Sequence, residues 1–157
     1  MVGARKGTSL AELVVVVVIL AAMAMVAVPR FSHALVRMKR AEAAAAKLVT
    51  DLRLTRSMAI RDAATNRGGY KLEMTGTAPY SGYRIEAVDT HQVAASHTFE
   101  PGVTVLCAGA SRFVYLPLGN LKADESGTQI TVAAEGMTLT LTLDAVSATG
   151  SVQCTKE

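Results

Sequence analysis

The feature that most constrains this chain is an uninterrupted apolar run near its start. Residues 13–28 contain no charged side chain, and the stretch from Thr8 to Val28 is 21 residues long. A helix rises 1.5 Å per residue, so this stretch spans about 30 Å, the thickness of the hydrocarbon core of a bilayer. Arg5 and Lys6 precede it, and basic residues favour the cytoplasmic side. The sequence therefore predicts a transmembrane helix, with everything after Pro29 outside the cytoplasm.

Glu12 places a carboxylate inside this apolar stretch. A charged group there costs about 2.5–3.5 kcal/mol on insertion scales, and by default it indicates a function. A secretory signal peptide cut near residues 22–24, or a plain uncut anchor, leaves this carboxylate unexplained. A side chain that snorkels to the lipid headgroups is the structural alternative.

The sequence Lys-Gly-Thr-Ser-Leu-Ala-Glu-Leu-Val-Val at residues 6–15 resembles the N-terminal motif of type IV prepilins and type II secretion pseudopilins. Gly7, Glu12 and Pro29 all stand in the register of that family. The resemblance implies that a prepilin peptidase cuts between Gly7 and Thr8 and then N-methylates Thr8. The family usually has Phe or Met at the position of Thr8, and the chain departs from the motif there.

The resemblance also implies roles for Glu12 and Pro29. In a fibre core, the new ammonium group at Thr8 pairs with Glu12 of an adjacent subunit. A slipped register would leave a buried charge unpaired, so the pair sets the registry of the subunits. Pro29 lacks a backbone N–H, and it predicts a helix kink or a boundary between two helices.

A basic helical stretch follows the apolar one. Residues 30–67 carry nine basic and three acidic groups, whereas residues 68–157 carry five basic and nine acidic groups. The stretch has no Gly or Pro from Arg30 to about Thr65, and we expect one helix from Leu10 to about Ala64, ended by the cluster at residues 66–69. Small and apolar residues at helical spacing predict a face that packs on a sheet, namely Ala41, Ala45, Leu48, Leu52, Thr55 and Ala59.

After Gly69 the pattern changes to a period of two, which is typical of strands. Glu135-Gly136 predicts a tight hairpin, and the polar stretch that contains His91 and His97 is interpreted as a loop. The predicted strands are Tyr70–Met74, Tyr83–Val88, Val103–Cys107, Arg112–Leu116, Gln129–Ala134, Met137–Leu143 and Ser151–Cys154. The predicted fold class is α+β: a long N-terminal α-helix, transmembrane in its first half and amphipathic in its second, packed on an antiparallel β-sheet domain that is whole or in two halves.

Three further segments narrow the resemblance to the GspH/FimT group of minor pseudopilins and minor pilins. Residues 51–61 look like the end of its spine helix, residues 113–119 resemble its F-x-P-x-G turn, and residues 150–152 resemble its closing strand with Ser151 in place of Arg. The resemblance implies a leader peptide (1–7), a fibre-core helix (8–29), a spine helix (30–66) and a periplasmic β-rich domain (67–157).

Cys107 and Cys154 are the two cysteines, and neither belongs to a CxxC motif. In an extracytoplasmic domain they either form one disulfide or stay as two buried free thiols. The three histidines are scattered without metal-ligand spacing, and the sequence has no phosphate-binding loop or nucleophile motif. We therefore expect no enzymatic activity, no cofactor and no metal site.

The expected function is that of a minor pseudopilin or pilin subunit, built in near the tip of a type II secretion pseudopilus or type IV pilus, where it serves assembly and protein secretion. The expected partners are prepilin peptidase, other pilin-like subunits, the inner-membrane assembly platform and membrane lipid. The alternative is a FimT-like minor pilin that binds DNA during natural transformation, which requires clustered Lys and Arg. The expected location is the bacterial inner membrane, single-pass, with a cytoplasmic N-terminus and a periplasmic C-terminal domain, and then an extracytoplasmic fibre. The sequence alone does not separate secretion, pilus and competence systems.

Overall fold

A computed structural model describes the backbone of residues 9–134, 137–143 and 152–156, and the side chains of residues 9–25, 35–134 and 137–142. The chain divides into two compact units, residues 1–36 and residues 37–157. The described elements are one long helix, eight strands and one 3₁₀ turn, η1 (Ala123–Glu125).

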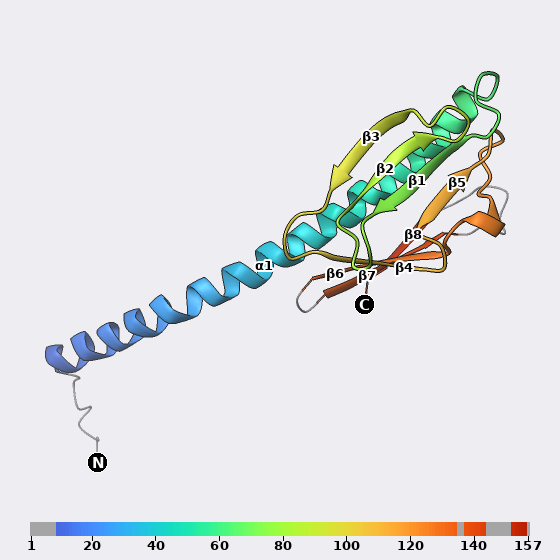
Figure 1. Cartoon of the computed structure of the whole chain (residues 1–157). Helices are drawn as coiled ribbons and strands as arrows, with labels where there is room; N and C mark the ends of the chain where they lie inside the picture. Colours follow the sequence, from blue (N-terminus) through green and yellow to red (C-terminus); the bar gives the residue numbers. More distant parts are fainter. Residues whose placement is uncertain (1–8, 135–136, 144–151, 157) are drawn as a thin grey trace, which may run out of the picture. The chain divides into compact units, whose positions relative to one another are not determined.

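The helix α1 (Leu10–Arg61) is 52 residues long and runs through Pro29 without a break in its assignment (Figure 1). The Pro29 side chain lies outside the described side chains, so the kink stays a prediction. The helix ends three residues before the predicted Ala64, because the bonding tightens to three residues back: the N–H of Ala63 donates to the Ile60 carbonyl (3.4 Å) and that of Thr65 to the Asp62 carbonyl (3.0 Å). The chain therefore turns before it reaches the glycines.

The predicted α+β class is confirmed, but the predicted transmembrane helix is wrong. Within the described residues, no helix is both long and apolar enough to cross a membrane. The same finding does not support the predicted single-pass location in the inner membrane.

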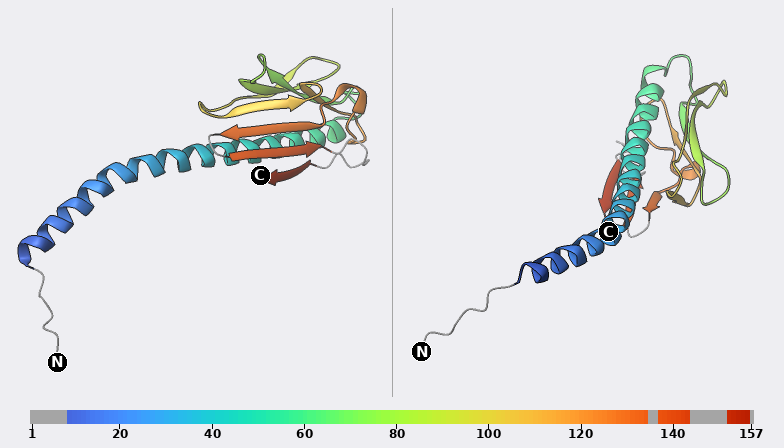
Figure 2. Two further views of the ribbon diagram at one scale, coloured as in Figure 1. Left: turned by 90° about the horizontal axis from the view of Figure 1, so that it is seen from below. Right: turned by 90° about the vertical axis from the view of Figure 1, so that its left-hand side faces the viewer.

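The strands form two antiparallel four-stranded sheets, which is the second of the two predicted arrangements. In sheet A the order is β3-β2-β1-β5, and in sheet B it is β4-β6-β7-β8. Figure 2 shows both sheets beside the second half of α1. Sheet A consists of β1 (Tyr70–Thr75), β2 (Gly82–Ala87), β3 (Val93–Thr98) and β5 (Arg112–Tyr115), and sheet B consists of β4 (Thr104–Ala108), β6 (Gln129–Ala134), β7 (Met137–Leu143) and β8 (Val152–Lys156).

Seven of these strands match the sequence prediction within a few residues, and β3 was missed. Its residues were interpreted as a polar loop because they show no alternation, and nearly all of them are exposed in the structure. Between β6 and β7, Ala134 pairs with Met137, so their connection is two residues long. The predicted turn residues, Glu135 and Gly136, lie outside the described residues.

One hydrophobic core joins α1 to both sheets within the second unit. The predicted helix face is confirmed, since Leu48 and Leu52 are fully buried together with the small residues of the same stripe. From sheet A the core receives Leu72, Tyr83, Ile85 and Phe113, and from sheet B it receives Val105, Ile130, Val132, Leu139 and Leu141. In β7, Leu139 and Leu141 are buried in this core while Thr138, Thr140 and Thr142 are not, as the alternation predicted.

Candidate assembly interface

The N-terminal segment of α1 exposes apolar side chains on every side. Residues 10–25, here called the apolar segment, are all exposed. The five consecutive valines from Val14 to Val18 retain between 50% and 61% of their accessible surface. Successive residues on a helix are about 100° apart, so five in a row cover its whole circumference. A helix that is apolar all round is normally buried, which indicates that this segment is covered by something else.

Glu12 lies in the first turn of α1 and is exposed. It has no hydrogen-bond or ion-pair partner among the described residues. The predicted cleavage site at Gly7 and Thr8 lies outside the described residues. The structure therefore does not test the predicted contact between the Thr8 ammonium group and Glu12.

The second half of α1 is fixed to sheet A by a buried carboxylate. Asp51 is 5% exposed, and its oxygens accept hydrogen bonds from the Tyr83 hydroxyl (2.7 Å) and from the Lys47 ammonium group (2.9 and 3.0 Å). Burial, and then the hydrogen bond to Asp51, raise the pKa of Tyr83 far above its ordinary value. The phenol therefore stays protonated and donates to the carboxylate at physiological pH.

A groove lies along α1 within the second unit. It encloses about 380 Å³, and its walls are formed by Ala45, Ala46, Val49 and Leu139 together with polar residues of α1. Glu42 and Arg53 also line it. The small alanines leave room for another backbone to approach, which fits a contact with a further helix.

The outer face of sheet A carries a network of ion pairs. Lys71 lies 3.4 Å from both Glu73 and Glu86, and Arg84 lies 2.9 Å from Glu73 and 3.2 Å from Glu86. His91 contacts the Glu86 carboxylate at 2.9 Å, from a backbone with a positive φ of 56°. The network holds the β2–β3 loop on the sheet and leaves each of its cations with an acidic neighbour.

Most basic side chains on the described part of the spine are also paired. Lys39 contacts Glu42, Arg40 contacts Glu100, and Arg61 contacts Asp62. The Arg56 guanidinium donates to the Gly119 carbonyl at 2.9 Å. Arg53 is the basic side chain on this part of the spine that has no hydrogen-bond or ion-pair partner among the described residues. No observation here favours the DNA-binding alternative, which needs several cations free to meet phosphates.

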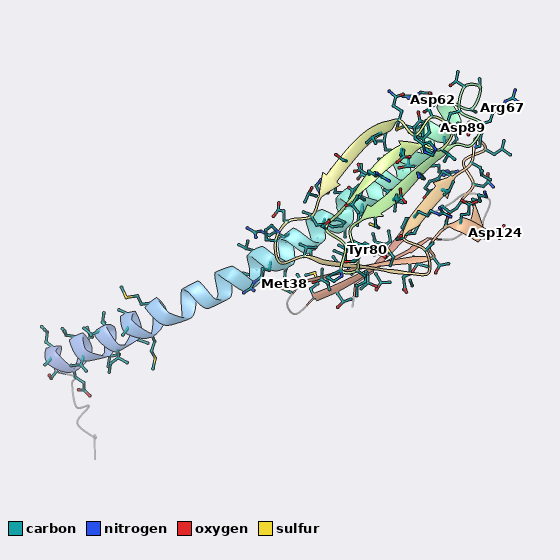
Figure 3. The ribbon with its side chains drawn as sticks, viewed as in Figure 1. Met38, Asp62, Arg67, Tyr80, Asp89 and Asp124 are labelled. Atoms are coloured by element: carbon teal, nitrogen blue, oxygen red, sulfur yellow. The ribbon has the colours of Figure 1, made fainter. Side chains whose placement is uncertain are left out.

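A small polar cluster closes the connection between α1 and β1. The Asp62 carboxylate accepts hydrogen bonds from Arg61 (2.8 Å) and from the Tyr70 hydroxyl (2.9 Å). These hydrogen bonds, with that of Arg61 the larger, lower the pKa of Asp62 to about 2. Asp89 accepts from the Gly68 N–H at 2.9 Å. Figure 3 labels Asp62, Arg67 and Asp89 close together in this region.

Of the two alternatives for Cys107 and Cys154, the sheet order favours separate thiols over a disulfide. Cys107 pairs with Ile130, Ile130 with Leu141, and Leu141 with Cys154, so β6 and β7 separate the two cysteines. Three strand spacings of about 4.8 Å amount to roughly 14 Å, whereas bonded cysteines have Cα atoms within about 7 Å of each other. Cys107 is a free, half-buried thiol.

Among the described residues, no group of three His, Cys, Asp or Glu side chains is placed to hold a metal ion. Sequence reasoning missed the contact of Asp51 with Lys47 and Tyr83. The spacing of four residues between Lys47 and Asp51 indicates their ion pair. Nothing in the sequence links either of them to Tyr83, which is 32 residues away from Asp51.

Comparisons of the chain with protein-family models, with curated proteins and with solved structures find no match.

Proposed function

We propose that this protein is a minor pilin-like subunit that is processed at its N-terminus and assembles into an extracytoplasmic fibre. The observation that supports the proposal is the apolar segment, which is exposed on every side of α1. Covering it with like helices from other subunits removes this surface from water, at about 25 cal/mol for each Å². A fibre of parallel helices is one assembly that covers the segment over its full circumference.

Glu12 gives this assembly its register. It is unpaired among the described residues, and a carboxylate inside a packed apolar core is stable only beside a positive group. Cleavage after Gly7 creates such a group, the ammonium of Thr8, four residues before the carboxylate in the sequence. Glu12 of one subunit then meets the Thr8 ammonium of a neighbour, and axial slippage is disfavoured.

The resemblance of residues 51–61, 113–119 and 150–152 favours the GspH/FimT group, and so a minor subunit close to the fibre tip. In the structure, Gly119 has a positive φ of 81° and lies against Ile60 of α1. The turn at residues 113–119 is therefore part of the contact between the helix end and sheet A. The expected partners are prepilin peptidase, the other subunits of the fibre and its assembly platform.

The test is the mass of the N-terminus, in cells with and without a prepilin peptidase. We expect a chain that begins at Thr8 only when the peptidase is present. Gly7→Ala should abolish this cleavage, while Gly3→Ala, a matched change within the leader, should leave it unaffected. Glu12→Gln should permit cleavage and reduce recovery of the protein in sheared fibres.

An intact Met1 in the presence of an active peptidase would overturn the proposal. A start after residue 24 would do the same, because it would remove the apolar segment in the manner of a signal peptide. Equal cleavage of the Gly3 and Gly7 variants would show that the peptidase does not read this motif.

A further inference from the structure

The strand β3 leaves an open edge on sheet A. Phe99, the residue after β3, donates a hydrogen bond from its N–H to the Ser81 carbonyl (2.9 Å). Within β3, His97 lies opposite Tyr83 of β2, and Ala95 lies opposite Ile85. In an antiparallel ladder every second residue bonds to the same neighbour. The N–H and C=O groups of Ser96 and Thr98 therefore point away from β2, and no hydrogen bond joins them to any described residue.

The other edges with described side chains are covered by the chain itself. On β5, Lys122 donates to the Val114 carbonyl (2.8 Å), and Gly127 donates to the Arg112 carbonyl (3.0 Å). On β4, the Tyr80 N–H donates to the Val105 carbonyl at 3.0 Å. Proteins commonly protect an exposed edge with charged residues or proline. β3 has neither, since its sequence is Val-Ala-Ala-Ser-His-Thr.

β3 is also held firmly enough to act as a template. The His97 ring packs against Tyr83, with centroids 5.3 Å apart, and meets Phe99 edge-on at 6.0 Å. A bulge opposite Ile85 and Glu86 interrupts the ladder on the Val93 side, so the regular part of the edge is the stretch Ser96–Thr98.

We propose that β3 pairs antiparallel with β3 of a second copy of this chain, about a two-fold axis at His97. Ser96 then lies opposite Thr98 of the other copy and Thr98 opposite its Ser96, which satisfies all four outward N–H and C=O groups of each strand. Ser96 and Thr98, which face each other, have small uncharged side chains. His97 lies opposite His97 of the other copy at the axis, so the edge is complementary to itself. Two copies of sheet A become one sheet of eight strands, and an isologous two-fold contact of this kind is the commonest in homo-oligomers.

The pairing has a consequence for assembly. The strands of sheet A run roughly along the second half of α1 (Figure 1), and a two-fold axis across the strands reverses this direction in the second copy. The helices of the pair therefore run in opposite directions. Such a dimer differs from a fibre in which every helix runs the same way. The inference therefore does not rest on the proposed function.

The experiment is site-directed cross-linking of the full chain in mild detergent, which covers the apolar segment and so excludes contacts through it. Two exposed residues receive a cysteine, Ser96→Cys in one chain and Thr98→Cys in a chain with a size tag. In the proposed register their Cα atoms are about 5.5 Å apart, which suits a disulfide. In a dimer of one variant alone, the introduced cysteines of the two copies lie two residues out of register.

We expect the mixture to give the mixed-size disulfide dimer several times more efficiently than either variant gives its own dimer. Equal cross-linking of the mixture and of the single variants would overturn the register. An absence of cross-linked species, with far-ultraviolet circular dichroism unchanged, would overturn the pairing itself.

Sedimentation provides a second, cysteine-independent measurement. Ser96→Pro removes one outward N–H at an edge position where proline is tolerated, and it should shift the sedimenting species from dimer to monomer at high protein concentration. Ser96→Ala keeps that N–H and should sediment like the native chain. A Ser96→Pro variant that dimerises as well as Ser96→Ala would contradict the proposal.

Discussion

At the scale of single residues, the buried Asp51 carboxylate links the long helix to sheet A. Tyr83→Phe removes the donor at 2.7 Å and leaves Lys47 as the hydrogen-bond partner of the carboxylate. Losing one partner of a buried charged group costs about 1–3 kcal/mol. We expect the free energy of unfolding, measured with urea in mild detergent, to fall by this amount.

Tyr80→Phe is the matched control, because Tyr80 is half-buried and its hydroxyl makes no hydrogen bond with a described residue. Its free energy of unfolding should stay close to that of the native chain. Equal losses in the two variants would show that the Asp51 contact does not stabilise the fold.

The Cys107 thiol belongs to the same scale. Burial raises its pKa to about 12, and the thiolate is the form that reacts with alkylating reagents. In a Cys154→Ser chain at pH 8, we expect Cys107 to be alkylated at least about tenfold more slowly in the folded state than in urea. Equal rates, read by mass spectrometry, would show that the thiol is not shielded by the fold.

Ionisation of Glu86 makes the stability of the fold depend on pH in the acidic range. The hydrogen bond from His91, assisted by Lys71 and Arg84 and opposed by burial, lowers the pKa of this carboxyl below its ordinary value of 4.5. A group with a depressed pKa in the folded state stabilises the fold above its unfolded pKa, and this stability is lost as the pH falls through the folded pKa. Between pH 6 and pH 3, Glu86→Gln should therefore lose less stability than the native chain, as measured by urea unfolding at each pH.

At the scale of elements, the long helix and most strands were predictable from local patterns. The spacing of Ala41, Leu48 and Leu52 specified the buried face of α1, and the alternation in residues 137–143 specified β7. β3 was not predictable, because an edge strand with two wet faces needs no alternation of apolar residues. The two alternatives for the cysteines also stayed open, since sequence does not show that β6 and β7 lie between their strands.

The features of the candidate interface also divide into those that the sequence predicts and those that depend on the fold. The apolar segment and Glu12 stand out in the sequence because charge and hydropathy are local properties of the chain. The Asp51–Tyr83 contact and the open edge of β3 depend on which strands become neighbours. The pairing of the strands is seen only in the folded structure.

The connection from α1 to β1 depends on one glycine. Gly69 has a positive φ of 79°, and a Cβ atom there would lie 1.9 Å from the Tyr115 carbonyl oxygen. Gly102 also has a positive φ, 89°, but a Cβ atom there meets nothing closer than 3.8 Å. Gly102→Ala should therefore cost about 1–2 kcal/mol for the backbone alone.

Gly69→Ala should cost more than Gly102→Ala by a further 1–3 kcal/mol or so, because β5 must shift to admit the methyl group. Thermal unfolding followed by circular dichroism compares the two. If the two variants unfold at the same temperature, close packing at Gly69 is not what the connection requires.

At the scale of the whole molecule, the two compact units differ in where their apolar residues lie: one buries them in its own core, and the other exposes them. Every buried apolar residue of the described core lies between Ala41 and Leu141, inside the unit of residues 37–157. The apolar segment belongs to the other unit and contributes nothing to that core. The core is therefore confined to the second unit, and the proposed assembly depends on a segment outside that core.

This division predicts the behaviour of a chain that begins at Arg37. Without the apolar segment it should fold, since it keeps the whole described core, and it should remain no larger than a dimer in the absence of detergent. The full chain should form large particles that detergent disperses, because its exposed valines must be covered. Size-exclusion chromatography with light scattering, with and without detergent, separates the two. A shortened chain that aggregates, or a full chain that is monomeric without detergent, would contradict the assignment of assembly to the apolar segment.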